Sequence, residues 1–303
     1  MAQISKIPVI LDTDIGGDID DTWALAMLLN SPELDVKLIV SATGDTVGRA
    51  KVAAKLLEIA GRTDIPVGIG RPEPLYPFAQ SAWVADYDLD KYPGPVHQDG
   101  VKAMVDTIMG SPEPITLIAI APLPNVGAAL EREPRIAEKA RFVGMHGAVR
   151  KGYDGAPQIA EEYNVKNNIP AAKRTFTAPW REVVITPLDT CGIVRLVGEK
   201  YQAVANCPDP LTRAVIENYR LWLQHCDWLK EKVDHGRSSI LFDTVAVYLA
   251  FADDLLVMEE IGIRIDDEGF TREDPTAPKM KVATGWRDYG AFEDLLLKRL
   301  KAK

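Results

Sequence analysis

The chain has 303 residues, of which 47% are hydrophobic and 26% are charged, a composition typical of a folded globular protein and not of a disordered one. The net charge of −9 argues against a nucleic-acid partner, because phosphate binding needs clustered Lys and Arg, and here these residues are scattered. α/β folds often use this length for one core, so we expect a single domain over 1–303.

Three cysteines, Cys191, Cys207 and Cys226, are an odd number without close spacing, which favours neither a disulfide framework nor a zinc site. The N-terminus lacks the basic and apolar regions of a signal peptide, and no stretch reaches the roughly 18 apolar residues of a membrane span. We therefore expect a cytoplasmic protein that has no membrane partner and binds a small molecule.

Short β-branched runs alternate with helical patterns along the first half of the chain, which predicts an α/β fold with a central, mainly parallel sheet flanked by helices. The expected strands are 8–14, 36–42, 65–70, 115–121, 141–147 and 182–189. The expected helices are 20–29, 47–61, 100–110 and 125–133.

Three further segments have patterns of their own. Residues 71–98 are rich in proline and aromatic residues, which predicts a long excursion over the surface. Residues 209–233 form a long amphipathic pattern, which predicts a helix. The tail predicts two short strands and a helix over 288–303, which we interpret as a covering layer.

Ligands of an open parallel sheet bind beyond the C-terminal ends of its strands. The segments that follow the predicted strands should therefore converge on one crevice. These segments are 12–21, 43–46, 120–125, 145–153 and 187–189.

The first strand runs into a dense group of carboxylates, with five aspartates in ten residues: Asp12, Asp14, Asp18, Asp20 and Asp21. Such a cluster repels itself unless a cation or an array of hydroxyl donors neutralises it. Calcium takes six to eight oxygen ligands of this kind. The alternative is an acidic loop without a ligand. The spacing is not that of an EF-hand loop.

The segment ILDTDIGGDIDDTWAL resembles the N-terminal signature of the nucleoside hydrolase family, the inosine-uridine-preferring N-ribohydrolases, in a longer variant with two additional residues. Further segments resemble the family's motifs in the family's order. These are ITLIAIAPLPNVGAAL (115–130), RFVGMHGAVRKG (141–152), EEYNV (161–165), VVITPLDTC (183–191) and LFDTVAV (241–247). Ala121, Pro124 and His146 are departures from those motifs.

The resemblance implies a nucleoside hydrolase-like α/β fold with one calcium ion, Ca2+, at the strand ends. Asp14 matches the aspartate that contacts calcium and activates the attacking water. Asp21 and Asp243 match metal ligands, and Ile120 matches a residue whose backbone carbonyl binds the metal. The implied substrate is a nucleoside or related riboside, and the implied assembly is a homodimer or homotetramer.

The same resemblance assigns the sugar-binding residues. Asp20, Glu162 and Asn164 match residues that bind ribose hydroxyls, and Asp45 stands where many members have a ribose-binding asparagine. Cleavage of an N-glycosidic bond passes through an oxocarbenium-like transition state, so anionic groups beside the sugar stabilise it. The resemblance therefore implies hydrolysis of the N-glycosidic bond of a ribonucleoside.

The match fails in places that matter for the leaving group. Phe242 stands where many members have a proton-donating histidine, and Ala156 lies near the place of a missing asparagine. His146, at a strand end, and three residues upstream of Phe242 are candidates to replace that histidine as proton donor. An exposed or capping role is the simpler interpretation of each. These three are His225, Asp227 and His235. We interpret Asp18 as a turn cap.

Aromatic residues in segments that border the crevice can stack on a base. Trp83 and Trp228 are the main candidates, Tyr87 and Tyr153 are further ones, and Trp222 is better explained as core.

Two other functions remain open at this point. The first is a nucleoside hydrolase-like protein that binds its ligand with weak or no catalysis. The second is a phosphotransferase of the haloacid dehalogenase type, since a strand that ends in Asp-x-Asp also opens that fold. Gly16 does not fit that pattern, which also leaves Glu162, Asn164 and Asp243 unexplained.

Overall fold

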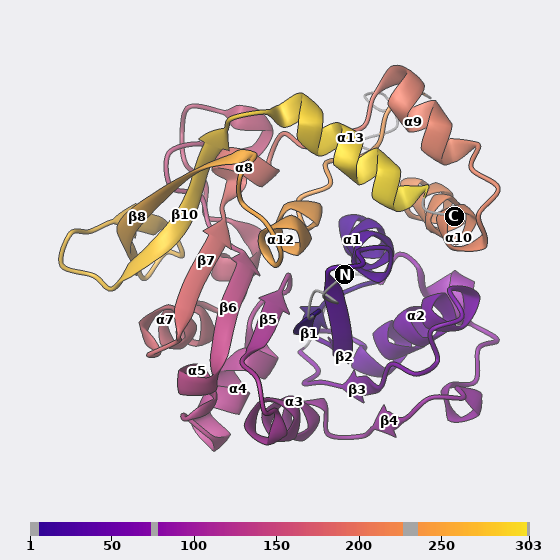
Figure 1. Cartoon of the computed structure of the whole chain (residues 1–303), viewed down its shortest axis with the longest axis horizontal. Coiled ribbons are helices and arrows are strands. Elements are labelled where there is room, and N and C mark those ends of the chain that lie inside the picture. The colour runs from indigo at the N-terminus through magenta and orange to yellow at the C-terminus, as the bar shows by residue number, and fades with distance from the viewer. Residues whose placement is uncertain (1–5, 74–77, 227–235, 302–303) are drawn as a thin grey trace, which may run out of the picture.

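The computed structural model describes residues 6–73, 78–226 and 236–301. Within these residues ten strands form one sheet with helices on both faces, which confirms the predicted α/β fold with a mainly parallel sheet (Figure 1). In sheet order the strands are β4 (Val96–His97), β3 (Val67–Ile69), β2 (Leu34–Ser41), β1 (Ile7–Thr13), β5 (Ile115–Ala119), β6 (Ala140–Met145), β7 (Glu182–Thr186), β10 (Lys279–Trp286), β8 (Leu256–Ile265) and β9 (Thr271–Glu273).

Strands β4 to β7 are parallel to their neighbours, with β1 between β2 and β5. Val9 to Asp12 of β1 pair with Thr116 to Ala119 of β5, so Asp12 and Ala119 end their strands side by side. The predicted tail differs from the structure. β10 pairs parallel to β7 and antiparallel to β8, so the tail strands extend the main sheet, and only the tail helix α13 (Tyr289–Leu300) lies over it as expected.

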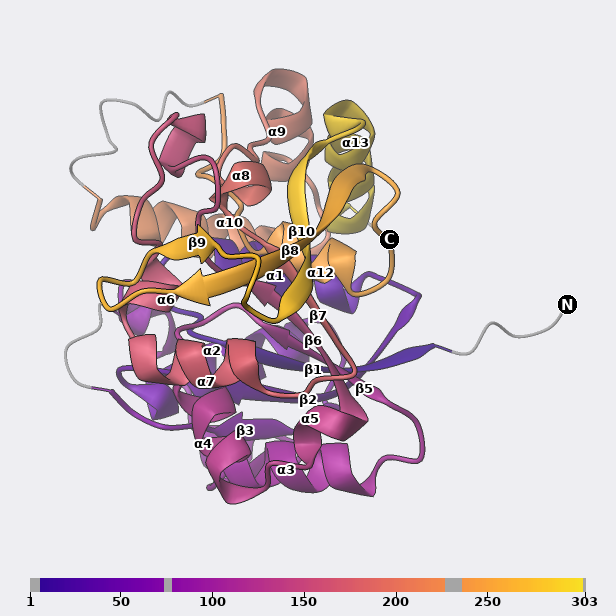
Figure 2. The same ribbon diagram turned by 90° about the vertical axis from the view of Figure 1, so that its left-hand side faces the viewer.

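The helices form a layer on each face of the sheet (Figures 1 and 2). The longer ones are α1 (Asp20–Leu29), α2 (Thr46–Ile59), α3 (Gly100–Gly110), α4 (Pro124–Arg132), α7 (Ile169–Thr177), α9 (Gly198–Ala205), α10 (Pro210–Leu223), α12 (Thr244–Leu249) and α13 (Tyr289–Leu300). The short ones are η1 (Ser81–Val84), η2 (Leu89–Lys91), α5 (Ile136–Lys139), η3 (Tyr153–Gly155), α6 (Tyr163–Lys166) and α8 (Leu188–Cys191). None of the helices described here is long and apolar enough to cross a membrane.

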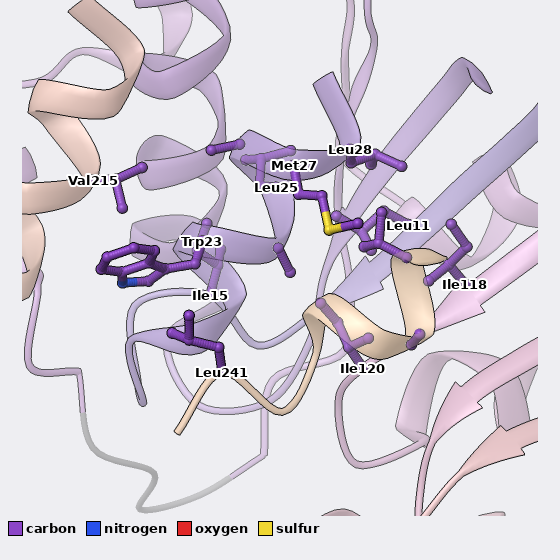
Figure 3. Close-up of a cluster of buried hydrophobic side chains, with 14 of the residues drawn as sticks. Leu11, Ile15, Trp23, Leu25, Met27, Leu28, Ile118, Ile120, Val215 and Leu241 are labelled. Carbon is purple, nitrogen blue, oxygen red and sulfur yellow. The ribbon is translucent and has the colours of Figure 1, made fainter. Parts of the chain in front are cut away.

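Side chains of alternate strand residues face opposite layers, which divides the core into two clusters. Leu11 belongs to the cluster under α1, α10, α12 and α13, and Ile10 belongs to the one under α3, α4 and α7. Figure 3 shows the first cluster, with Trp23 of α1 between Val215 of α10 and Leu241, two residues before Asp243. This packing fixes α1 against the segment that leads into α12.

Two other expectations have a structural outcome. The excursion over 71–98 contains η1, η2 and the short strand β4 in its described part. The helix predicted over 209–233 begins as expected at Pro210, behind the N-cap Asp209, but α10 ends at Leu223. Residues 227–235, which include Asp227, Trp228 and His235, lie outside the described part of the chain.

Candidate active site

Three buried carboxylates meet above the C-terminal end of β1. Asp20 and Asp21 begin α1, where the positive end of the helix dipole favours acidic groups, and Asp243 precedes α12. α1 packs against α12, and one ligand oxygen from each of the three side chains lies within 4.8 Å of the others. Two aspartates from the start of the chain and one from beyond residue 240 therefore form one oxygen cluster.

The electrostatics of this triad are unfavourable without a cation. Burial raises the pKa of Asp20, Asp21 and Asp243 well above the usual value, and mutual repulsion raises these pKa values further. The carboxylates of Asp20 and Asp243 are close enough for the charge of Asp20 to raise the pKa of Asp243. The hydroxyl of Thr13 donates a hydrogen bond to Asp21 and orients it.

Asp14 lies at the edge of the triad and interacts with it electrostatically. Burial raises its pKa to about 6, while the nearby positive charge of Arg49 opposes this shift. The buried guanidinium of Arg49 donates to the backbone carbonyls of Asp14, Ile15 and Thr43, the last two at 3.0 and 2.9 Å. Arg49 thus fixes the backbone that carries Asp14 and places the nearest buried cation beside the carboxylates.

Ile120, at the end of β5, connects the cluster to the predicted sugar-binding residues. Its N–H donates to the carbonyl of Asp12 at 2.9 Å, and its carbonyl accepts from the amide of Asn164 at 3.3 Å. A carbonyl oxygen has two lone pairs, so this hydrogen bond leaves one available for a metal ion. The structure therefore brings the Ile120 carbonyl to the same strand end as the aspartates.

Glu162 and Asn164 are buried beside this carbonyl. The Glu162 carboxylate accepts from the N–H groups of Gly147, Asn164 and Val165 at 2.9, 2.7 and 3.1 Å. Burial raises the pKa of Glu162 to about 7, and the charge of Asp14 contributes to that rise. Asn164 also donates to the carbonyl of Met145 at 3.0 Å. Both predicted ribose ligands thus face the region of Asp14 and Ile120.

Hydrogen bonds join four of the five segments that were expected to converge, and the contact of His146 with the carbonyl of Ala121 connects 145–153 with 120–125. Asn125 donates to the carboxylate of Asp12 at 2.7 Å and to the carbonyl of Ser41 at 3.0 Å. The carboxylate of Asp189 accepts from the N–H groups of Val149 and Arg150, both at 2.8 Å. The strand ends of the central sheet therefore form a connected network.

Sequence reasoning assigned no role to Asp189 or Arg49. Asp189 belongs to a quoted motif, but nothing in a single sequence shows that its carboxylate anchors the loop after β6. The burial of Arg49 could have been inferred from the sequence, because Arg49 shares one face of α2 with the apolar residues Val52, Ala53 and Leu56. A charged residue on an apolar helix face points to a buried partner.

Two predicted ligand-binding residues have other contacts. Asp45 is the exposed N-cap of α2, and its carboxylate accepts from the N–H of Gly48 at 2.9 Å. Trp83 is buried in the core against α2, where the ammonium of Lys55 lies 4.1 Å from its ring centroid. Capping of α2 therefore accounts for the position of Asp45, and core packing accounts for the position of Trp83. Trp228 lies outside the described residues.

His146 is completely buried below the strand ends. Its Nε2 lies 3.1 Å from the carbonyl of Ala121, and its ring packs near Phe142 and Phe176. Burial lowers the pKa of His146 to about 4, so the imidazole is neutral at physiological pH. The structure places His146 in the core between β6 and α7, where a neutral ring cannot act as an acid.

Asp18 and Phe242 have local contacts at the two sides of the site. The Asp18 carboxylate is exposed and accepts from the N–H of its neighbour Ile19 at 2.7 Å, while the N-cap of α1 is Ile19 itself. Phe242 contacts the ring of Tyr153, with the ring centroids 6.0 Å apart. This aromatic pair borders the carboxylates at the position before Asp243.

The donor set fits a hard divalent cation. Several carboxylates and one backbone carbonyl supply oxygen only, and their burial and repulsion call for a positive charge between them. No histidine or cysteine belongs to the triad, so within the described residues the chemistry favours oxygen-preferring ions over zinc.

A mainly parallel α/β sheet with a buried carboxylate cluster at its strand ends is compatible with both the hydrolase and the phosphotransferase considered from the sequence, and sequence comparison decides between them. The inosine-uridine preferring nucleoside hydrolase family matches residues 9–293, so the chain belongs to that family and is a hydrolase acting on N-glycosyl compounds. The match removes the phosphotransferase alternative and confirms the resemblance seen in the motifs.

Individual relatives and solved structures that resemble this chain differ in the substrate that their names give. The pyrimidine-specific ribonucleoside hydrolase RihA of Citrobacter koseri is 28% identical over 317 residues, which cover 97% of this chain and 98% of the relative. A plant nucleoside hydrolase has a TM-score of 0.84 at 23% identity, covering 99% and 100% of the two chains. A purine-preferring ribonucleoside hydrolase from Gardnerella vaginalis has a TM-score of 0.79 at 20% identity, covering 97% and 98%.

The buried state of His146 predicts a pH effect on stability. An unfolded histidine binds a proton below its ordinary pKa of about 6.5, whereas the folded protein keeps His146 neutral down to about 4. His146 therefore stabilises the fold above pH 6.5, and this contribution is lost by about 1.4 kcal/mol per pH unit as the pH falls. Urea unfolding of wild type and His146→Gln between pH 7 and 5 measures it.

The expected result is a wild-type free energy of unfolding that falls more steeply with decreasing pH than that of His146→Gln. The exposed His97→Gln provides the control and should follow the wild type. Parallel profiles for all three proteins would show that His146 becomes charged in the folded state.

Proposed function

We propose that this protein hydrolyses the N-glycosidic bond of a ribonucleoside in a calcium-dependent reaction. The observation that carries the proposal is the meeting of Asp21 and Asp243, from the two extremes of the family match, in one buried oxygen cluster with Asp20. Two acidic groups so distant in sequence would not be buried together without a common ligand.

The metal would be held by Asp14, Asp21, Asp243 and the carbonyl of Ile120. The position of Asp20 in the triad differs from the role that the motif implies, which is to bind a ribose hydroxyl. Asp20 would fit both its position and this role if its carboxylate contacted the cation and a ribose hydroxyl at the same time. When bound, calcium would bind the ribose diol and lower the pKa of a water molecule.

The chain's own residues would orient the sugar and move the proton. Asp14, which lies at the edge of the triad, would accept the proton of the attacking water as general base. Glu162 and Asn164 lie beside Ile120, where they would bind ribose hydroxyls. The negative charges of this group would stabilise positive charge on the sugar in the transition state.

The base would leave on the side of Tyr153 and Phe242. Their edge-to-face contact forms an aromatic surface next to Asp243, and the hydroxyl of Tyr153 accepts a hydrogen bond from the N–H of Tyr163 at 3.1 Å. Burial and the charge of Glu162 raise the pKa of Tyr153, so its hydroxyl keeps its proton and can donate a hydrogen bond to a bound base.

We also propose three further properties that the resemblance and the sequence imply. They are a single domain over 1–303, a homodimer or homotetramer, and a cytoplasmic location. The location is supported by the cysteine content, because three cysteines without close spacing do not favour a disulfide framework. Neither pyrimidine nor purine preference is proposed, because the named relatives differ in this respect.

The activity is tested with inosine, uridine and 4-nitrophenyl riboside in the presence of calcium. We expect release of base or nitrophenol by wild type, and a loss of about 100-fold to 10,000-fold in kcat for Asp14→Ala, because it lacks the general base. Asp106→Ala on the exposed surface of α3 is the control and should retain wild-type activity. Ribose binding without turnover of any of the three compounds would contradict the proposal and indicate a binding protein.

The leaving-group side is tested with Tyr153→Phe, which keeps the ring and removes the hydroxyl. We expect kcat on inosine to fall about 10-fold to 100-fold and kcat on 4-nitrophenyl riboside to change little, because nitrophenolate leaves without a proton. Phe242→His should then restore part of the inosine activity in the Tyr153→Phe background. Equal losses on both substrates would show that Tyr153 binds the sugar and does not assist the base.

A further inference from the structure

A segment within the excursion over 71–98 packs directly on the loop that carries the carboxylates. We define the carboxylate loop as residues 14–19, between β1 and α1, and the strap as residues 78–84. Within the described residues the loop has few hydrogen bonds of its own. The N–H of Gly17 donates to the carbonyl of Asp14 at 3.3 Å, and no side chain caps the N-terminus of α1. The orientation of Asp20 and Asp21 therefore depends on contacts from outside the loop.

Arg49 and Thr13 provide some of those contacts, and Gln80 provides others from a completely buried position. Its backbone N–H donates to the carbonyl of Gly16, and its side-chain amide donates to the carbonyl of Asp18, both at 3.2 Å. Its side-chain oxygen accepts from the hydroxyl of Thr22 at 3.0 Å. One residue thus binds the start and end of the loop and the first turn of α1.

Phe78 positions the strap for this contact. Its ring occupies the space in which a Cβ atom on Gly16 or on Gly48 would lie, so it fits only because both positions lack a side chain. Gly16 also has a φ of +100°, a conformation that other residues rarely adopt. The loop and the strap therefore have complementary shapes.

We propose that Gln80 is a positioning residue that holds the carboxylate loop in the geometry required for cation binding. Thr22 is adjacent to Asp21 and lies on the same helical turn as Asp20, so a hydrogen bond to Thr22 fixes the part of α1 from which both carboxylates project. Carboxylates that repel each other adopt a shared geometry only when their backbone is restrained. This inference rests on the proposed cation site.

The test measures calcium affinity directly and needs no turnover. Isothermal titration of the full-length protein with calcium chloride is compared for wild type, Gln80→Leu, Thr22→Val and the double variant. We expect Gln80→Leu to raise the Kd for calcium at least 10-fold. Thr22→Val should raise it less, because the backbone and Asp18 contacts of Gln80 remain. The double variant should resemble Gln80→Leu, because the two side chains act through the same hydrogen bond.

Asn218→Leu is the matched control. Asn218 is a completely buried amide in α10 that donates to the carbonyl of Ala214 in the same helix. Its loss should lower the midpoint of thermal unfolding and leave the calcium Kd unchanged. In Gln80→Leu the activity should return toward the wild-type kcat at saturating calcium, because the side chains that bind the metal are intact.

Two results would overturn the inference. If Gln80→Leu lowers the unfolding midpoint as Asn218→Leu does but keeps the wild-type calcium Kd, the strap only stabilises the fold. If the effects of Gln80→Leu and Thr22→Val on the Kd multiply, the two residues act independently. Absence of calcium binding by wild type would instead remove the proposed cation site itself, and that failure is visible before any variant is made.

Discussion

The structure depends on the repulsion between carboxylates that the fold buries at one end of its central sheet. Asp20, Asp21 and Asp243 have pKa values raised by burial and by one another, with Asp14 close enough to contribute. Burying several like charges is costly unless an opposite charge compensates them. The protein therefore retains at its strand ends an arrangement that is unfavourable alone and favourable with a bound cation.

The surrounding elements maintain this arrangement. Trp23 and Leu241 pack in the cluster that fixes α1 against the start of α12 (Figure 3). Arg49 holds the backbone of Asp14, and Asn164 links the Ile120 carbonyl to the sugar-binding side. These contacts are formed by rigid strands, helices and buried side chains, which suits a site that must act through placement and charge.

Much of this could be predicted from the sequence, because it follows from local patterns. The strand and helix rhythm gave the parallel core, and the Asp14 to Asp21 cluster marked the strand end that carries the site. Other features arise from tertiary contacts with no local signal. The hydrophobic period of the tail strands is the same whether these strands cover the sheet or extend it. The role of Asp45 as a helix cap and the burial of His146 beside Phe142 and Phe176 also depend on the folded structure. Gln80 and Thr22 are 58 residues apart in the sequence, so no local pattern shows that they form a hydrogen bond.

The central claim is that these oxygens surround one hard cation. Anomalous diffraction from crystals grown with calcium chloride tests it most directly. The account predicts one strong peak within about 2.3–2.6 Å of carboxylate oxygens of Asp14, Asp21 and Asp243 and of the Ile120 carbonyl. Absence of a peak at this position, with Asp21 and Asp243 separated from each other, would contradict it.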